Sequence, residues 1–334
     1  MKRIDFRSDT VTRPTLKMRE AMFNAEVGDD VYRDDNTVKE LEALACSVLN
    51  KEAALLVTSG TLGNLLAILS QTNKGEEIIL SSNSHILTHE VGGVAYIAGC
   101  MTKAISNDND FIYAKDVANN IRVDDIHEPK TSLLCLENAL GNGMVVPLDI
   151  MKETYLKAKE NNLRVHLDGA RIFNAAIALN TSVSEVAKYA DTVMFCLSKG
   201  LAAPIGSMLV GDKETIDKAR KLRKMLGGGM RQAGVLAGPG IIAINEMSKR
   251  LKEDHDNAKY LALKLKETNK FEINDHKIDI NIVFAKYLGD TNDLDSKLDD
   301  AGILYNKASN NVYRFVTHLD INKKDIDNFI NVIE

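Results

Sequence analysis

The chain has 334 residues, of which 45% are hydrophobic, and a formal net charge of −5. This length and composition predict a soluble globular protein, with one large and one smaller domain at roughly 100–200 residues per domain. The acidic balance offers no basic surface for nucleic acid, and no apolar run approaches the roughly 20 residues that cross a bilayer. We therefore expect neither a nucleic-acid partner nor a membrane partner.

The four cysteines show no metal-type spacing, and the opening MKRIDFRSDT lacks the apolar run of a secretory signal. Three of the four lie inside apolar stretches, where reduced thiols of a core are usual. These features favour a cytoplasmic protein with free thiols. The cysteines are Cys46, Cys100, Cys135 and Cys196.

In chain order, residues 1–27 lack a clean period and are expected to form an arm that packs elsewhere on the protein. A helix follows at 36–50, where Thr37 and Glu40 have the spacing of a capping box. Strands and helices then alternate. Because the strands are continuous apolar runs, they favour a mostly parallel sheet covered on both faces. The predicted strands are 53–59, 76–82, 131–138, 164–171, 191–200 and 206–212, and the predicted helices between them are 60–72, 148–162 and 183–190.

The last third of the chain has a different pattern. Residues 213–226 and 234–269 are predicted helices, and two predicted strands follow at 280–286 and 311–318. This mixture is typical of a small α+β domain. The expected division of the chain is 1–27 for the arm, 28–245 for a large α/β domain and 246–334 for the small C-terminal α+β domain.

Polar side chains follow the predicted strands, and open α/β sheets bind ligands at the carboxyl ends of their strands. Ser59, Gly60 and Thr61 lie between a strand and a helix, where free backbone N–H groups and two hydroxyls suit a phosphate. The segment matches neither a P-loop nor a dinucleotide-binding fingerprint. A plain turn that requires glycine is the alternative interpretation.

Two further strand ends carry ionisable residues. Asp168 and Arg171 lie in LDGAR, and Lys199 lies in CLSKG. A lysine with an ordinary pKa is almost fully protonated at neutral pH, so a nucleophilic lysine must be desolvated or already joined to a carbonyl. The carboxylate of Asp168 suits a protonated ring nitrogen. The simpler alternatives are an N-cap aspartate with a surface arginine, and a structural lysine whose amine reaches water.

Taken together, a phosphate seat, an aspartate and a Schiff-base lysine are the three anchors of pyridoxal 5′-phosphate. Asp168 and Lys199 end strands separated by one helix, so they can reach one planar ligand from different sides. His85 follows the strand at 76–82 and supplies an imidazole able to stack on a ring and to carry a proton. The sequence therefore predicts pyridoxal 5′-phosphate as the cofactor.

With these motifs in place, the chain resembles the L-threonine aldolases of the aspartate-aminotransferase-like superfamily, which are pyridoxal-phosphate enzymes of fold type I. The combination of HLDGAR, CLSKG and GGGMRQAG is the most specific part, and matching segments run from FRSDTVTRP to YRFVTH. The resemblance implies an α/β fold with a mostly parallel sheet in the large domain and a smaller C-terminal α+β domain. It also implies a cytoplasmic homodimer or homotetramer whose active sites are shared between subunits.

The resemblance assigns cofactor roles by position. Lys199 would be the Schiff-base lysine, Asp168 the partner of the pyridine nitrogen and His85 the ring-stacking histidine. Gly60 and Thr61, with Ser59 before them, would hold the phosphate. The whole implied cofactor-binding set is Ser59, Gly60, Thr61, His85, Asp168, Arg171, Lys199, Lys224 and Arg231.

The resemblance also assigns the binding of the substrate. Ser8, Arg171 and Arg314 would bind the substrate carboxylate, a task that suits the two-pronged guanidinium of arginine. Lys224 and Arg231 would reach the cofactor of the partner subunit. The simpler interpretation of these basic residues is that they are solvated charges on a helix or a strand.

Two positions depart from the family pattern. LENALGNG places Leu140 where these enzymes usually have a histidine, and His89 replaces an aromatic residue near the ring-stacking histidine. In the family both positions lie near the β-hydroxyl of the substrate. We therefore expect His89 to take over part of the missing imidazole's work and to act with Lys199 and His85 in catalysis.

The implied reaction is the retro-aldol cleavage of L-threonine, L-allo-threonine and related β-hydroxy-α-amino acids to glycine and an aldehyde, acetaldehyde for threonine. One alternative keeps the cofactor and changes the bond that breaks, which would make the protein a β-eliminating lyase or a racemase. Another is a cofactor-free or pyridoxal-storing binding protein.

A metal site is the remaining alternative, because His85 and His89 have HxxxH spacing and Glu90 follows. That spacing binds a metal from one helix, whereas this stretch has the pattern of a loop. The acidic residues 107–110 lack the glycine and distal glutamate of a calcium loop and are expected to form a solvated turn. We expect no bound metal.

Overall fold

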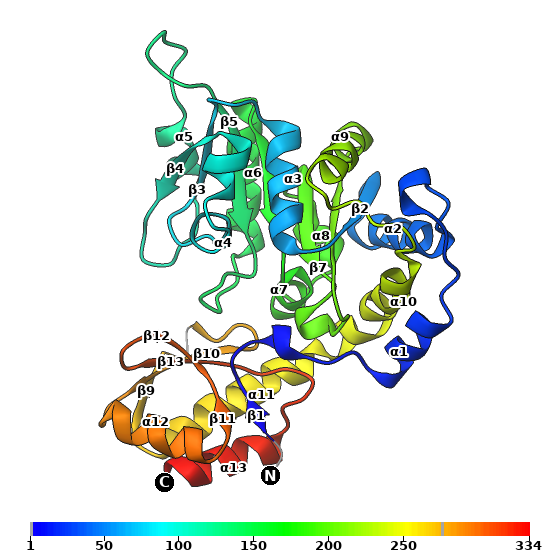
Figure 1. The fold of residues 1–334 in the computed structure, drawn as a ribbon. Helices are drawn as coiled ribbons and strands as arrows, with labels where there is room; N and C mark the ends of the chain where they lie inside the picture. Colours follow the sequence, from blue (N-terminus) through cyan, green and yellow to red (C-terminus); the bar gives the residue numbers. More distant parts are fainter. Residues whose placement is uncertain (1–2, 275–276) are drawn as a thin grey trace.

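The protein is described by a computed structural model that covers residues 3–274 and 277–334. Its centre is a seven-stranded sheet (Figure 1). The strands are β2 Ala53–Val57, β3 Glu77–Ser81, β4 Met101–Ile105, β5 Thr131–Glu137, β6 Arg164–Asp168, β7 Thr192–Cys196 and β8 Ser207–Gly211. Their order across the sheet is β2-β8-β7-β6-β5-β3-β4, and only β8 runs antiparallel to its neighbours. The predicted mostly parallel sheet is confirmed.

Helices cover both faces of this sheet. Within β7, Met194 and Cys196 join the apolar cluster under one set of helices, whereas Val193 and Phe195 join the cluster on the other face. This alternation between two buried faces explains why the strands are continuous apolar runs. On the first face lie α3 Gly60–Gln71 and α9 Lys213–Met225, and on the other lie α2 Asn36–Leu49, α5 Ala114–Asn120, α6 Leu148–Glu160, α7 Ile172–Ala178 and α8 Val183–Ala187.

The C-terminal region forms a second, antiparallel sheet with its own apolar cluster. Its strands are β9 Phe271–Ile273, β10 Ile282–Tyr287, β12 Asn306–Ser309 and β13 Val312–Val316, in the order β12-β13-β10-β9. The helices that pack on it are α11 Ser248–Glu267, α12 Thr291–Asp300 and α13 Lys323–Ile333. The smaller α+β unit is therefore present, and the expected domain boundaries at residues 27 and 245 stay predictions.

The N-terminal segment links the two sheets (blue in Figure 1). Its strand β1 Ile4–Asp5 pairs in parallel with β11 Ile303–Leu304, and Phe6 is fully buried in the C-terminal cluster. The short helices η1 Asp9–Val11 and η2 Asp30–Tyr32 follow, with α1 Leu16–Phe23 between them. Near η1, the Thr12 hydroxyl donates to the Lys199 carbonyl at 2.8 Å. The segment thereby lies beside the end of β7.

Several local predictions are wrong. Helix α2 is capped by Asp35, whose carboxylate accepts the Val38 N–H, while the Thr37 hydroxyl donates to the Glu26 carbonyl. The stretch expected to be a loop begins with a short helix, α4 His85–Thr88. The helix expected at 234–269 is interrupted in its middle by a π-helical turn. Its parts are α10 Gly234–Ile242, η5 Ala243–Met247 and α11, and a second π-helical turn, η3, covers Val94–Ala98.

Among residues 3–274 and 277–334, no helix combines the length and apolar composition that a bilayer crossing requires.

The close approach of α3 to β7 depends on Gly63. A Cβ atom at this position would lie 2.7 Å from Met194 Cγ, which is shorter than any normal carbon–carbon contact. Gly63→Ala should therefore destabilise the fold by about 1–3 kcal/mol through overpacking, measured as a lower midpoint of denaturant unfolding. Gly93→Ala is the control, because its Cβ would lie 3.9 Å from Leu65 Cδ1. Equal stability of the two variants would contradict this account of the α3–β7 contact.

Candidate active site

A cavity of about 310 Å³ lies where β6 and β7 end and α3 begins. Its size is that of a pocket for a small ligand. Six residues that the sequence singles out come from four separate segments and line this one cavity. They are Ser59, Gly60, Thr61, His85, Asp168 and Lys199.

Lys199 stands at the start of the short helix η4 Lys199–Leu201, directly after β7. Its backbone has the left-handed φ of 63°, which is unfavourable for a residue with a side chain and is often found at functional sites. The amine has no hydrogen bond or ion pair with any described residue. The lysine therefore offers an unpaired amine to the cavity.

The first turn of α3 forms another wall of the cavity. Ser59 caps the helix, because its side-chain oxygen accepts the Leu62 N–H at 3.1 Å. The backbone N–H groups of Gly60 and Thr61 have no acceptor in the part of the chain that the structure describes. A Cβ at Gly60 would lie 3.1 Å from Met194 Cε, so the helix start packs closely over β7. Free N–H groups at a helix start suit an anion such as a phosphate.

Asp168 ends β6 and is almost fully buried. One of its oxygens accepts from Asn64 Nδ2 at 2.8 Å, and the other accepts the Ala170 N–H at 3.1 Å. The same Asn64 Nδ2 also donates to Glu90 Oε1 at 2.8 Å. One buried amide therefore joins two buried carboxylates beside the cavity.

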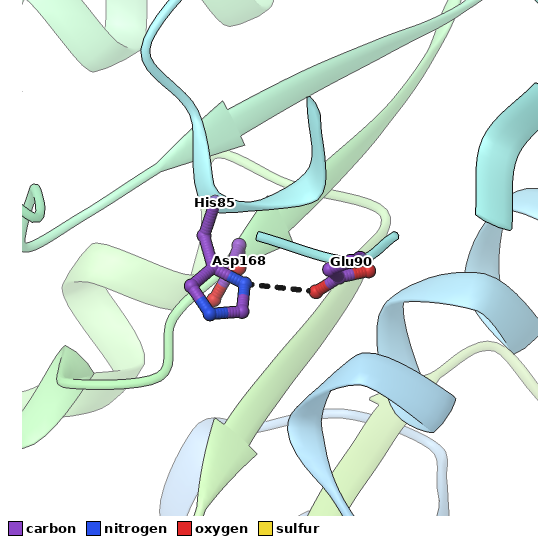
Figure 2. A group of neighbouring side chains, drawn as sticks. All are labelled: His85, Glu90 and Asp168. Atoms are coloured by element: carbon purple, nitrogen blue, oxygen red, sulfur yellow. Dashed lines mark hydrogen bonds and ion pairs between the residues drawn. The ribbon is translucent and has the colours of Figure 1, made fainter. Parts of the chain in front are cut away.

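The His85 ring lies in front of Asp168 and beside Glu90 in Figure 2, with Nδ1 3.0 Å from Glu90 Oε1. The hydrogen bond to Glu90 raises the pKa of His85, with desolvation opposing it and the charge of Asp168 adding to it. The start of helix α4 is held at the end of β5, because the His85 N–H donates to Glu137 Oε2 at 2.9 Å. The imidazole is thus held in place from both its ring and its backbone.

His89 stacks on His85, with ring centroids 5.3 Å apart and an angle of 14° between the planes. Its side chain is exposed, it does not line the cavity, and its Nδ1 lies 2.6 Å from the Thr88 hydroxyl. The structure therefore brings His89 to the ring of His85 rather than to the cavity itself.

The site also offers a cation one histidine and two carboxylates, because ligand atoms of His85, Glu90 and Asp168 lie within 4.8 Å of one another. His89 is not part of this group. The NH₂ of Asn64, however, points at both carboxylates and already donates a hydrogen bond to each. A cation would have to displace this donor, so the set of groups favours a hydrogen-bonded network.

Arg171 and Arg314 lie in different settings. Arg171 is buried and binds Asp9 through two parallel hydrogen bonds of 2.8 and 2.7 Å. Burial alone would raise the pKa of Asp9, but the charge and hydrogen bonds of Arg171, the charge of Lys199 and the Asn281 hydrogen bond together hold the pKa well below its usual range. Arg314 donates to the Arg7 carbonyl and has no carboxylate partner among the described residues. Burial, aided by the charge of Arg171, lowers the pKa of Arg314 to about 10.

The remaining predicted residues lie outside the cavity. Ser8 caps η1 by accepting the Thr10 N–H at 3.2 Å. Lys224 and Arg231 are exposed, and Arg231 pairs with Asp29 at 2.8 Å. Neither of these two basic residues lines the cavity.

Sequence reasoning missed four residues that organise the site: Asp9, Asn64, Glu137 and the role of Glu90 as a partner of His85. Asn64 follows Gly60 by one helical turn, so helical spacing alone could have placed it near the phosphate seat. Asp9 stands next to Ser8 in the motif used above, but its partner is 162 residues away. Glu137 pairs in register with Asp168, and burial followed by the Asp168 charge raises its pKa to about 7.

The residues around the cavity fit pyridoxal phosphate on their own chemistry. A helix start with two free N–H groups faces the space, and an unpaired lysine amine, a buried carboxylate and an imidazole line it. Each group meets one need of that cofactor: an anion seat, a covalent anchor, a partner for the ring nitrogen and a stacking surface.

The chain is similar to known proteins over nearly its whole length. Residues 5–287 match the model of the β-eliminating lyase family. A low specificity L-threonine aldolase of Escherichia coli K12 is 43% identical over 326 residues, which is 97% of this chain and 96% of that protein.

Solved structures share the fold at lower identity. A Leishmania major threonine aldolase superposes with a TM-score of 0.87 at 18% identity, covering 99% of this chain and 98% of that one. An SPT structure with a PLP internal aldimine gives a TM-score of 0.74 at 19% identity, covering 99% of this chain and 86% of that one. The predicted fold type I architecture is thus confirmed, and the chain belongs to the β-eliminating lyase family, among its L-threonine aldolases.

Proposed function

We propose that the protein uses pyridoxal 5′-phosphate to cleave L-threonine, L-allo-threonine and related β-hydroxy-α-amino acids to glycine and an aldehyde. The observation that carries this proposal is the convergence of Lys199, Asp168, His85 and the start of α3 on one cavity. When bound, the cofactor supplies an electron sink for the charge that develops on the substrate Cα. The residues of the chain hold the cofactor, orient the substrate and transfer protons.

Each cofactor contact has a candidate residue. Gly60 and Thr61, with Ser59 as the cap, would hold the phosphate through their N–H and hydroxyl groups. Asp168 would accept a hydrogen bond from the protonated ring nitrogen. Lys199 would attach the cofactor covalently. His85 would cover one face of the ring, since its imidazole is held beside the cavity by Glu90.

The substrate carboxylate would bind to the guanidinium that lacks an acid partner. Asp9 occupies two N–H groups of Arg171, so the described part of the chain leaves Arg314 as the more available guanidinium. A held carboxylate fixes rotation about the Cα–N bond, and this orientation decides which bond at Cα breaks. Ser8 stands between Arg7, whose carbonyl accepts from Arg314, and Asp9, which binds Arg171, and it would add a hydroxyl contact.

The β-hydroxyl proton must leave as the Cα–Cβ bond breaks. We propose His85 Nε2 as its acceptor, because Nδ1 faces Glu90 and the pKa of the ring is raised by that hydrogen bond. His89, stacked on the same ring, takes the place of an aromatic residue and would help to hold the imidazole. Leu140, at the other position that differs from the family pattern, has no group that could accept the proton.

The proposed assembly is a cytoplasmic homodimer or homotetramer with shared sites. Lys224 and Arg231 are exposed and do not line the cavity of their own chain, which supports a role in binding the cofactor of a partner subunit. Large apolar side chains on the surface also support association of copies. They include Phe23, Tyr32, Val91 and Tyr96. The free state of all four cysteines supports a reducing compartment.

β-Elimination or racemisation is a second candidate, because the family model that matches the chain is that of β-eliminating lyases. Both reactions begin at the same Cα but release different products. Cleavage gives glycine and acetaldehyde from threonine, elimination gives a keto acid and ammonia, and racemisation gives the D-amino acid.

The first test is to incubate the purified protein with L-threonine and with L-allo-threonine and to trap acetaldehyde. Lys199→Ala should lower the rate to the uncatalysed background, because no other unpaired amine lines the described cavity. Lys51→Ala is the control, since Lys51 is a partly buried lysine that donates to the Ala190 carbonyl. Keto acid and ammonia as the products would contradict aldol cleavage.

His89→Phe tests the departure from the family pattern. If His89 supports the proton transfer at His85, this variant should lower kcat by about tenfold or more and change KM much less. Steady-state kinetics with L-allo-threonine measure both constants, and His127→Phe, at an exposed histidine, serves as control. Unchanged kinetics of His89→Phe would rule out a catalytic role.

Arg314→Leu tests the carboxylate site. Loss of a charged hydrogen-bond donor worth about 1.5–3 kcal/mol should weaken substrate binding about 10- to 150-fold, seen mainly as a higher KM. Arg164→Leu is the matched control, because Arg164 begins β6 at the opposite end from Asp168 and pairs with Asp212. If the two variants bind threonine equally well, Arg314 does not hold the carboxylate.

A further inference from the structure

A buried asparagine stands at the centre of the site. Asn64 is fully buried, and its Nδ2 donates to Asp168 Oδ2 and to Glu90 Oε1, both at 2.8 Å. Its Oδ1 lies 3.0 Å from His166 Nε2. The orientation of the amide is fixed by chemistry, because an amide oxygen turned toward two carboxylates would face only acceptors.

This orientation of the Asn64 amide determines which atoms donate in the hydrogen bonds on the His166 side of the asparagine. Because Asn64 Oδ1 accepts, His166 Nε2 must carry a hydrogen. Burial lowers the pKa of His166 to about 4, so the ring is neutral at pH 7 and its Nδ1 is an acceptor. The Thr192 hydroxyl, 2.9 Å away, therefore donates to that nitrogen. Gln71 Nε2 in turn donates to the Thr192 oxygen at 2.9 Å.

The same reasoning holds on the other side. Glu90 Oε1 accepts from Asn64 and lies 3.0 Å from His85 Nδ1. A carboxylate has no hydrogen to give, so His85 Nδ1 must be the donor. The neutral form of His85 then keeps its lone pair on Nε2. From Thr192 on β7 through His166 and Asn64, each hydrogen bond thus donates toward Glu90, and the His85 imidazole donates to Glu90 from the cavity side.

We propose that Asn64 is a positioning residue that fixes the tautomer of His85, with hydrogen on Nδ1, and couples this ring to Asp168 through one shared amide. The roles of His85 and Asp168 rest on the proposed function, but the tautomer is a property of the chain alone. In the simpler interpretation, Asn64 only satisfies buried carboxylates and has no effect on His85.

The pH dependence of His85 reflects groups from several elements around it. Glu90 and Asp168 favour its charged form, and Lys199 opposes it. Burial raises the pKa of Glu90, while the hydrogen bonds from His85 and Asn64 lower it. Loss of the Asn64 donor would therefore let Glu90 bind a proton at higher pH. The titratable groups that face His85 are Glu90, Glu137, Asp168, Lys199 and the stacked His89.

The experiment is nitrogen-15 NMR of labelled histidines in the full-length protein, as purified and after removal of bound cofactor. In the wild type we expect hydrogen on Nδ1 of neutral His85 and an unprotonated Nε2. In Asn64→Leu, which has a similar shape and no donor, this tautomer should lose its dominance. The pKa of His85 should also fall toward its ordinary value, because a Glu90 that binds a proton more readily stabilises the charged imidazole less.

Matched variants separate this effect from general damage. Asn174→Leu removes another buried asparagine whose Nδ2 lies 3.1 Å from a histidine nitrogen, that of His255, and should leave His85 unchanged. Glu90→Gln keeps an acceptor oxygen without its charge, so the pKa of His85 should fall while hydrogen stays on Nδ1.

The wild-type spectrum tests the proposal even if Asn64→Leu does not fold. Hydrogen on Nε2 of neutral His85 in the wild type would overturn it, and so would an unchanged His85 spectrum in Asn64→Leu or an unchanged pKa in Glu90→Gln. Failure of the proposed function would show separately, as absence of acetaldehyde from threonine with the wild-type protein.

Discussion

The structure depends on a sheet that is buried on both faces. Strands β5, β6 and β7 carry apolar side chains toward helices on either side, so charged side chains stand at the ends of these strands. Asp168 and Lys199 occupy such ends on adjacent strands, and α3 starts at a third. The burial that stabilises the sheet therefore also gathers the charged groups into one cavity.

Charges placed at such an edge must be compensated by partners, and the chain provides these from distant segments. Arg171 is neutralised by Asp9 of the N-terminal segment, which the pairing of β1 with β11 holds in place. Asp168 and Glu90 share the amide of Asn64. Among the described residues, the amine of Lys199 in the cavity and the guanidinium of Arg314 on β13 lack such compensation. An unpaired amine in the cavity suits a covalent anchor, and an unpaired guanidinium suits an anionic substrate.

The sequence was a good guide wherever function depends on local order. The continuous apolar strands predicted a two-sided parallel sheet, and the residues directly after them predicted six of the groups around the cavity. The antiparallel course of β8 left no trace in its composition, because a buried strand is apolar in either direction. The cap of α2 was misplaced at Thr37 because Asp35, two residues earlier, is an equally good capping residue.

The partners within the site could not be predicted in the same way. Asp9 and Arg171 are 162 residues apart, and Asn64 and Asp168 are 104 residues apart, so no local pattern joins them. His89 is four residues from His85 in the sequence, but only the fold shows that the two rings stack. Sequence patterns indicate where a side chain lies relative to a strand or helix. Its charge and tautomer depend on partners that the fold brings together.

The central claim is that the amine at the end of β7 holds the cofactor covalently. It is tested most directly by reducing the purified protein with borohydride, digesting it and locating the modified lysine by mass spectrometry. The account predicts a phosphopyridoxyl group on Lys199 and on no other residue. An unmodified Lys199, or the group on a different lysine, would contradict it.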